Sequence, residues 1–126
     1  MIEINNLTGK SVPASFLKRV AGNVLLLEKQ KGAELSVVIA GEAFVRTLNR
    51  RYRGKDKVAN VLSFPIAEFG LGEIVLCPAE IRKDAKKYGI SYTKALAWML
   101  IHGMLHLMGY THSQMEKREQ AYRSKI

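Results

Sequence analysis

Hydrophobic residues recur along this chain in two patterns, and the order of these patterns predicts the fold. Short apolar runs predict strands over 2–4, 35–40, 58–64 (ending before Pro65) and 73–77, with a turn over 68–72. Apolar residues three and four positions apart predict helices over 13–32, 42–51, 79–88, 91–108 and the polar segment from 113 onward. The order β-α-β-α-β-β-α-α-α is typical of an α+β fold with a small mixed sheet of about four strands.

Details within these segments predict which side chains are buried. Residues 95–108 are apolar on nearly all sides, as expected of a buried central helix. Phe44, Val45 and Leu48 share one side of the second predicted helix and are expected to pack inward. The hydroxyl of Ser63, on the third predicted strand, is expected to hydrogen-bond to backbone.

The composition fits a single globular domain spanning residues 1–126. The chain is 48% hydrophobic and 25% charged, which is ordinary for a globular protein of this length. Its longest apolar run, 95–101, is far shorter than the about 20 residues of a membrane span. The lone Cys77 cannot form an internal disulfide and is expected to be buried, and the first residues lack a signal-peptide pattern. These features predict a cytoplasmic protein.

An excess of basic residues predicts a polyanionic partner. Twenty Lys and Arg against eleven Asp and Glu give a formal net charge of +9, and domains this basic often bind RNA, DNA or an acidic membrane surface. The residues expected to contact phosphate lie in two clusters and are Arg46, Arg50, Arg51, Lys55, Lys57, Arg82 and Lys83. The alternative is that this basic surface only keeps the protein soluble.

All three histidines lie within eleven residues, at a spacing typical of metal ligands. His102 and His106 project from one side of the predicted central helix. Gly109 can adopt the left-handed conformation that ends a helix, and the returning chain would bring His112 toward the other two. Three imidazoles predict a metal site with an open fourth position, the arrangement of catalytic zinc, although nickel, copper and iron suit the same ligand type.

The same segment matches the zinc-protease pattern H-E-x-x-H-x-x-G-x-x-H at every position but one. Where proteases have the Glu that acts as general base, this chain has Gly103, so a peptidase mechanism lacks its central group. A glycine inside a helix is unfavourable by about 1 kcal/mol relative to alanine. Gly103 is therefore expected either to leave space beside the metal or to permit a tight helix crossing.

Three segments of the chain resemble the YbeY family, bacterial metal-dependent endoribonucleases involved in ribosomal RNA maturation. Residues 102–112, HGMLHLMGYTH, resemble the family form H-G-x-L-H-L-x-G-Y-D-H. Residues 48–65, LNRRYRGKDKVANVLSFP, resemble L-N-x-x-Y-R-x-x-D-x-x-T-[DN]-V-L-S-F-P, and residues 71–77, LGEIVLC, resemble L-G-D-I-x-I. The first of these segments is highly specific.

The resemblance implies a set of site residues. It implies one zinc per chain on the three histidines, with nickel or another divalent metal as the alternative, and a functional arginine at Arg53. A guanidinium is a fixed fork that suits phosphate oxygens and the charge that develops during phosphodiester cleavage. The chain departs from the family at Thr111 and Glu73, where the family has Asp, and at Ala59, where it has Thr. Thr111 and Gly103 are further catalytic candidates.

The resemblance also implies an activity and its partners. The expected function is that of a zinc-dependent, single-strand-directed endoribonuclease acting in ribosomal RNA processing and in maturation or quality control of ribosomes. Its partners would be ribosomal RNA or a ribosomal subunit, with possible ribosomal proteins and no membrane. Two alternatives stay open: a zinc hydrolase of another class, such as a peptidase or amidase, and a non-catalytic RNA-binding factor for ribosome maturation.

Overall fold

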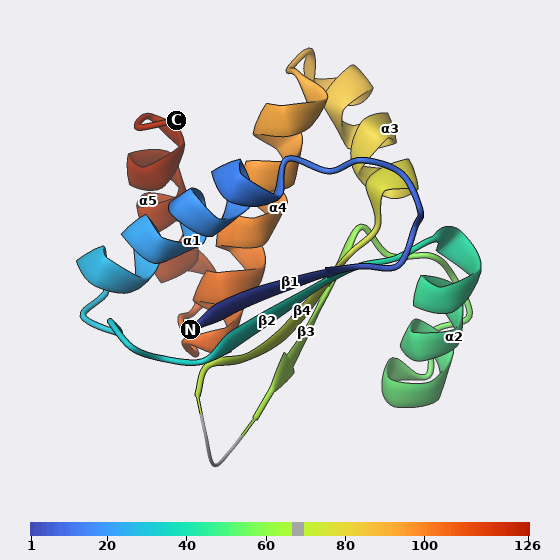
Figure 1. The fold of residues 1–126 in the computed structure, drawn as a ribbon, viewed down its shortest axis with the longest axis horizontal. Helices are drawn as coiled ribbons and strands as arrows, with labels where there is room; N and C mark the ends of the chain where they lie inside the picture. Colours follow the sequence, from blue (N-terminus) through green and yellow to red (C-terminus); the bar gives the residue numbers. More distant parts are fainter. Residues whose placement is uncertain (67–69) are drawn as a thin grey trace.

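The computed structural model describes residues 1–66 and 70–126, and its elements follow the predicted order (Figure 1). The strands are β1 (Ile2–Asn6), β2 (Leu35–Ile39), β3 (Val61–Pro65) and β4 (Gly72–Leu76). The helices are α1 (Ala14–Leu27), α2 (Glu42–Arg53), α3 (Pro78–Tyr88), α4 (Tyr92–Leu107) and α5 (His112–Arg123). Residues 68 and 69 of the predicted turn lie outside the described residues.

The strands form the predicted mixed sheet, in the order β1-β2-β4-β3. β1, β2 and β4 run parallel, whereas β3 pairs antiparallel with β4 at one edge. Alternate residues of the central strands enter two different hydrophobic clusters: Val37 and Ile74 lie in the larger one, and Val38 and Val75 in the smaller. Both faces of the sheet are therefore covered, which explains why β2 and β4 are apolar almost without interruption.

Helices cover the two faces unequally. α1 and α4 lie across one face, and α3 and α5 pack against α4 (Figure 1). On the opposite face, Val45 of α2 is buried in the smaller cluster. This arrangement confirms the predicted α+β architecture and places α4 at its centre, next to β3, β4, α1, α3 and α5.

α4 is buried along nearly its whole length, as its apolar composition predicted. Ser91 caps its start, because the Ser91 side chain accepts a hydrogen bond from the backbone N–H of Lys94 (3.1 Å). Among the described residues, no helix combines the length and the apolar character needed to cross a membrane.

Several sequence predictions differ from the structure in detail. α1 ends at Leu27 and not at residue 32, and Lys29 just beyond it has a positive φ of 58°, which no longer belongs to a helix. β3 begins at Val61 rather than at residue 58, and it includes Pro65, which an edge strand tolerates because one side of it has no hydrogen-bonding neighbour. Phe44 is 47% exposed, since only Val45 and its neighbours one turn away face the sheet. α5 begins at His112 and, although mostly exposed, it buries Met115 and Tyr122.

Candidate active site

Four elements surround a cavity of about 330 Å³ that contains every histidine of the chain. α4 contributes His102 and His106, the start of α5 contributes His112, and the end of α2 contributes Arg53. β3 supplies the floor, through residues 61–63. The structure thus brings the three predicted metal ligands and the predicted functional arginine to one place.

The histidines reach this cavity through the geometry of α4 and the turn that follows it. The rings of His102 and His106 are stacked, with centroids 6.4 Å apart and planes 11° apart, as expected for residues one helical turn apart. Gly109 then adopts a positive φ of 80°, a conformation that is unfavourable for residues with a side chain, and the chain reverses direction. His112 follows as the first residue of α5.

Thr111 fixes the start of α5 through a capping box. Its hydroxyl accepts a hydrogen bond from the backbone N–H of Gln114 (3.4 Å), and its own backbone N–H donates to Oε1 of Gln114 (2.9 Å). Thr and Asp both serve well as N-cap residues. The replacement of the family Asp by Thr111 therefore preserves the cap.

Glu119 is a site residue that the sequence analysis missed. Its Oε1 lies 2.5 Å from Nδ1 of His102, and because a carboxylate only accepts hydrogen bonds, this contact favours a proton on Nδ1. The Glu119 side chain is only 13% exposed, and Nη2 of Arg123 lies 3.5 Å from its other oxygen. Glu119 is seven residues after His112, on the same side of α5, and this spacing was the available signal.

The donor set fits a metal ion by its chemistry. Three imidazoles facing one cavity match catalytic zinc sites, and a carboxylate on the far nitrogen of a ligand histidine is a common supporting feature of such sites. In the side-chain conformations of the structure, no three His, Cys, Asp or Glu side chains among residues 1–66 and 70–126 gather closely enough to hold a metal. Coordination would therefore require the imidazole rings to turn.

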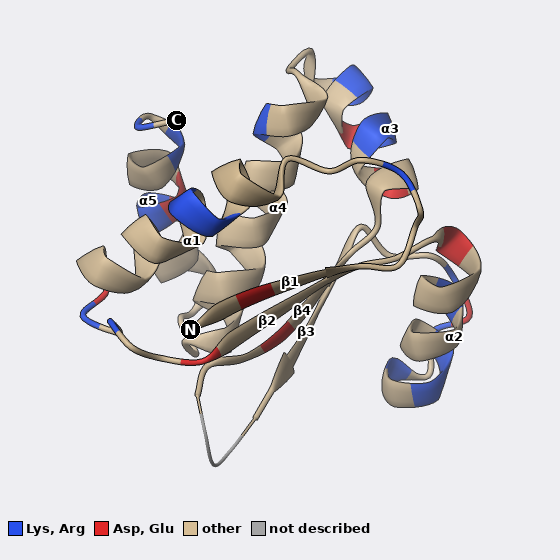
Figure 2. Cartoon of the chain, viewed as in Figure 1, with Lys and Arg blue, Asp and Glu red and all other residues tan. Residues whose placement is uncertain are grey.

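Arg53 lies at the basic end of α2. Gly54 ends this helix in the left-handed conformation, with a φ of 68°, immediately after the guanidinium-bearing residue. Arg53 also lines a neighbouring hollow of about 430 Å³, together with Lys55, Lys57 and His102. Figure 2 shows Lys and Arg gathered in the second half of α2 and along α3. Three basic side chains thus border the hollow next to the histidine cavity, and Glu80 and Asp84 add two carboxylates to its lining.

Several predicted phosphate-binding residues have partners within the protein. Arg46 donates two hydrogen bonds to Asp56 (2.9 and 3.2 Å), which lower the pKa of that carboxyl, and Arg50 lies 3.8 Å from the same carboxylate. Lys83 forms an ion pair with Glu80 (2.9 Å). Ion pairs among the described residues do not include Arg51, Lys55 or Lys57, so these have the least competition for phosphate.

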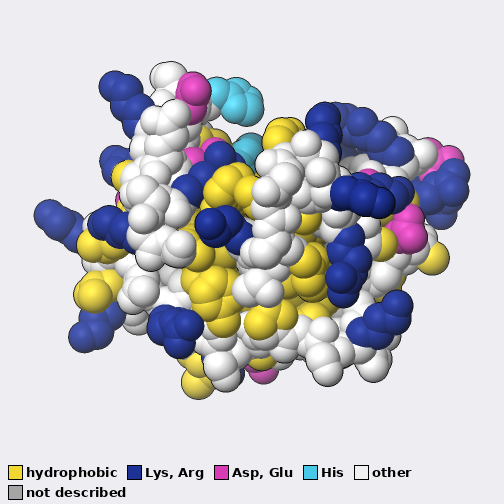
Figure 3. Space-filling view, turned by 90° about the horizontal axis from the view of Figure 1, so that it is seen from above, with side chains coloured by type: hydrophobic (Ala, Val, Ile, Leu, Met, Phe, Trp, Pro, Cys, Tyr) yellow, Lys and Arg dark blue, Asp and Glu magenta, His cyan; other side chains and the backbone are white. Residues whose placement is uncertain are grey.

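The second basic cluster, on α3, is also partly engaged. The guanidinium of Arg82 lies over the ring of Tyr92, 3.8 Å from its centroid. In the space-filling view of Figure 3, basic side chains nevertheless surround a largely apolar centre, acidic ones are fewer, and histidines lie near one edge. The margins of this face therefore suit a polyanion, even though individual residues differ in availability.

Gly103 serves the packing of α4 on the sheet. A Cβ at this position would lie 3.2 Å from two carbons of Ile74 and 3.2 Å from Oγ of Ser63, so the space is already filled by β3 and β4. Of the two expectations for Gly103, close packing is the one that matches, although the partner is the sheet and not another helix. As predicted, the Ser63 hydroxyl bonds to backbone, donating to the carbonyl of Gly103 (3.2 Å).

Cys77 is fully buried beside the smaller cluster, as predicted, and burial raises the pKa of its thiol. It lines neither the histidine cavity nor the neighbouring hollow. It therefore has no contact with the histidine cavity.

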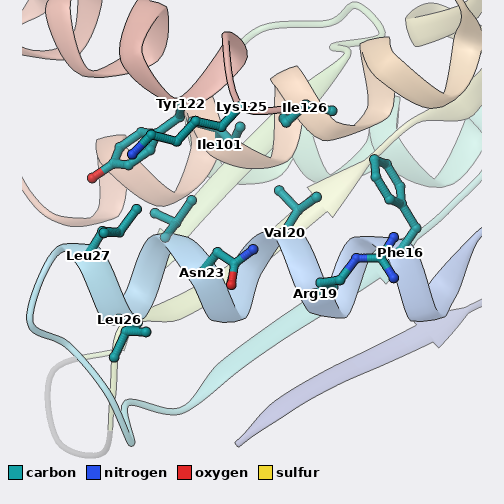
Figure 4. Close-up of a pocket in the computed structure, with 11 residues that line it drawn as sticks. Phe16, Arg19, Val20, Asn23, Leu26, Leu27, Ile101, Tyr122, Lys125 and Ile126 are labelled. Carbon is teal, nitrogen blue, oxygen red and sulfur yellow. The ribbon is translucent and has the colours of Figure 1, made fainter.

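A different hollow, of about 420 Å³, lies along α1 (Figure 4). Its walls are mostly apolar side chains of α1, with Tyr122 and Ile126 opposite them, and α4 contributes Ile101 rather than a histidine. None of its lining residues is acidic or a histidine. This hollow therefore offers no carboxylate or imidazole that could bind a metal.

Comparisons with known proteins agree with this assignment. A family model described as Endoribonuclease YbeY matches residues 3–125. The protein named Endoribonuclease YbeY from Persephonella marina is 35% identical, over 88% of this chain and 77% of the relative. The protein of the same name from Bacillus subtilis is 33% identical, over 97% of this chain and 88% of the relative.

A solved structure shares the fold. The solution structure of a Thermotoga maritima protein matches with a TM-score of 0.68 and 27% identity, over 98% of this chain and 87% of the other. The family, the α+β fold and the enzyme class predicted from the sequence are thus confirmed together. The chain belongs to the YbeY family of endoribonucleases, hydrolases that cleave phosphodiester bonds of RNA and act in ribosomal RNA processing.

Proposed function

We propose that this protein cleaves ribosomal or other structured RNA within single-stranded stretches, at the cavity formed by the three histidines and Arg53. The observation that carries this proposal is that Arg53 of α2 lines the same cavity as His102, His106 and His112 of α4 and α5. One domain, residues 1–126, carries the activity. Ribosomal RNA or a ribosomal subunit is the partner, ribosomal proteins are possible further contacts, and the cytoplasm is the location of such a substrate.

We assign one zinc ion per chain to His102, His106 and His112, with nickel or another divalent metal as the alternative. Bound there, zinc would supply a Lewis acid for the phosphate and would lower the pKa of a coordinated water toward about 7. The Glu119 carboxylate holds the proton of His102 on Nδ1, and this leaves Nε2 free to act as the ligand atom. Glu119 thus fixes which nitrogen of His102 faces the reaction.

Arg53 carries the electrostatic part of the reaction. Its guanidinium binds the scissile phosphate and stabilises the negative charge that grows on the phosphate oxygens as the bond breaks. A planar fork donates to two oxygens at once, which a lysine ammonium cannot do in the same geometry. Lys55 and Lys57, in the adjoining hollow, neutralise the flanking phosphates of the bound strand.

The test is cleavage of a structured ribosomal RNA fragment by purified wild-type protein and variants. We expect Arg53→Ala to keep its metal and most of its RNA affinity while cleavage falls by about 100-fold or more, the effect of removing a preorganised charge donor. Arg53→Lys should restore little of the rate. Arg19→Ala is the matched control: it removes an exposed arginine of α1 that lies outside the cavity and outside both basic clusters, and it should cleave nearly normally.

Two other outcomes would favour the alternatives. Cleavage that withstands a chelator and persists in both Arg53→Ala and His106→Ala would indicate a contaminating nuclease and would favour a non-catalytic RNA-binding factor. Chelator-sensitive hydrolysis of casein, measured in parallel, would favour a peptidase.

A further inference from the structure

A smaller hollow, of about 220 Å³, adjoins the active site along α4. Trp98 lines it and lies four residues before His102, which is about 6 Å along the helix axis. Asp84 lines this hollow and also the larger one that contains Arg53 and His102. The small hollow therefore continues the path that a strand of RNA would follow away from the histidines.

Aromatic and guanidinium groups form its walls. Trp98 and Tyr88 both line it, and Tyr88 is 63% exposed, so its ring is accessible to a ligand. The guanidinium of Arg123 lies 4.4 Å from the centre of the Trp98 ring. Planar rings and guanidinium groups are the surfaces on which proteins stack unpaired bases of single-stranded nucleic acid.

Two buried hydrogen-bond donors of this hollow have no partner among the described residues. These are Nε1 of Trp98 and Nε of Arg123. Buried donors are usually satisfied, so two of them beside one hollow indicate that a ligand with acceptor atoms could pair with them once the Trp98 and Arg123 side chains shift toward it. The hollow also has an acceptor of its own, the carboxylate of Asp84, which accepts a hydrogen bond from Nδ2 of Asn60 (2.8 Å).

These features select one class of ligand. A bare phosphate would meet the negative charge of Asp84, and a purely apolar ligand would leave both donors unsatisfied. A nucleobase is flat, has ring nitrogens or carbonyl oxygens that accept, and often has an amino group that donates. We propose that this hollow binds one unstacked base of the RNA substrate, next to the scissile phosphate. This proposal rests on the proposed RNA-cleaving function.

The hollow is also connected to the catalytic histidines. Arg123 contacts Glu119 (3.5 Å), and Glu119 holds Nδ1 of His102 (2.5 Å). A base seated against Arg123 would therefore lie two side chains away from His102. The position suits recognition of the nucleotide beside the cleaved bond.

Trp98 is the only tryptophan of the chain, so its fluorescence reports on this hollow alone. We would remove the metal with a chelator, so that the RNA is not cleaved, and titrate the protein with a short single-stranded RNA. A second titration would use an RNA of the same length that lacks its bases. Heparin serves as a third probe, because it is a polyanion without bases. We expect the normal RNA to change Trp98 fluorescence in a saturable way, whereas the other two bind without that change.

Tyr88→Ala tests the same hollow without touching the core. Loss of one stacking ring should weaken binding of the short RNA by about tenfold. Phe44→Ala is the matched control, since Phe44 is an aromatic residue that is also exposed (47%) but lies on α2, outside the hollow. Circular dichroism would verify that both variants fold.

The outcomes separate this proposal from the proposed function. An equal fluorescence change with the RNA that lacks bases would overturn the base site and leave a phosphate contact. Binding of labelled RNA, seen by anisotropy, with no change at Trp98 and a normal affinity in Tyr88→Ala would also overturn it while cleavage stands. Absence of any RNA binding would overturn both proposals, whereas a base-dependent change without metal-dependent cleavage would overturn the proposed function alone.

Discussion

The two sides of α5 carry two polar clusters that differ in how completely their groups satisfy one another. On one side, the side chain of Glu28 is only 4% exposed and accepts hydrogen bonds from the hydroxyls of Tyr110 and Tyr122, with Arg118 3.4 Å away. On the other side, Glu119 meets His102, but His106 and His112 are exposed at the cavity. The Glu28 carboxylate is thus fully occupied by partners within the protein, whereas the ring nitrogens of His106 and His112 remain available to a ligand.

This difference teaches which cluster stabilises the protein and which one acts. The Glu28 cluster joins the end of α1 to α5 and to the turn after α4, so it holds three parts of the chain in place. In the histidine cluster, by contrast, His106 and His112 are exposed to solvent. Buried polar groups that are fully satisfied add rigidity, while unsatisfied ones at a cavity mark a binding site.

The largest effect is expected when the histidine cluster loses one of its imidazoles. His106→Ala and His112→Ala should lower the metal content from about one ion per chain to nearly none, because two imidazoles cannot complete a three-ligand site. Elemental analysis after dialysis measures this. Tyr122→Phe, on the other side of α5, should retain its metal even though it weakens the fold. A full metal content in His106→Ala would contradict the assignment.

An intermediate effect is expected when the Glu28 cluster loses one hydrogen bond. Tyr122→Phe leaves the buried Glu28 carboxylate with one partner fewer and should lower the free energy of unfolding by about 1–3 kcal/mol in urea titrations. Tyr88→Phe, which removes the hydroxyl of an exposed tyrosine, should change it by less than about 0.5 kcal/mol. Equal stability of Tyr122→Phe and the wild type would mean that the cluster does not support the fold.

The same variant carries a pH signature. Burial, together with the hydrogen bond to Glu28, raises the pKa of Tyr122 above its usual value of about 10. A raised pKa in the folded state means that the contribution of Tyr122 is complete below about pH 10 and is lost as pH rises toward the folded value. Stability measured from about pH 8 to 11 should therefore fall less steeply in Tyr122→Phe than in the wild type.

The smallest expected effect concerns the basic surface outside both clusters. Replacing Arg50 and Arg51 together with Gln should make the log–log dependence of RNA affinity on salt shallower by about 0.7 to 1.4, since each phosphate contact on a single strand contributes roughly 0.7. The lower figure applies if Asp56 keeps Arg50 engaged. Lys83→Gln is the control, because Glu80 already pairs with that ammonium. A slope unchanged by the double replacement would assign this surface to solubility.

Local signals made most of the fold predictable. The apolar run of β2 and the nearly all-round apolar face of α4 each follow from a single period in the sequence. Gly109 marked the end of α4 because few other residues accept its positive φ. These signals depend on neighbours in sequence, and they also sufficed to bring the three histidines to one cavity.

The features that were wrong or missed depend on partners distant in sequence. β3 starts at Val61 because that residue is the first to pair with β4, opposite Leu76, and the apolar run alone does not show this register. Glu119 was missed because its role comes from His102, on another helix. The pairing of Arg46 with Asp56 likewise depends on how the chain turns after α2, which composition does not specify.

The capping box at the start of α5 has a thermodynamic consequence for the third histidine. Fixing the backbone of one residue costs roughly 1–2 kcal/mol of conformational entropy. Thr111 and Gln114 order the first turn of α5, which begins with His112, so this loss of freedom occurs when the protein folds and not when a ligand binds. Thr111 and Gln114, which are not metal ligands, would thereby raise the affinity of the site for a metal held by His112.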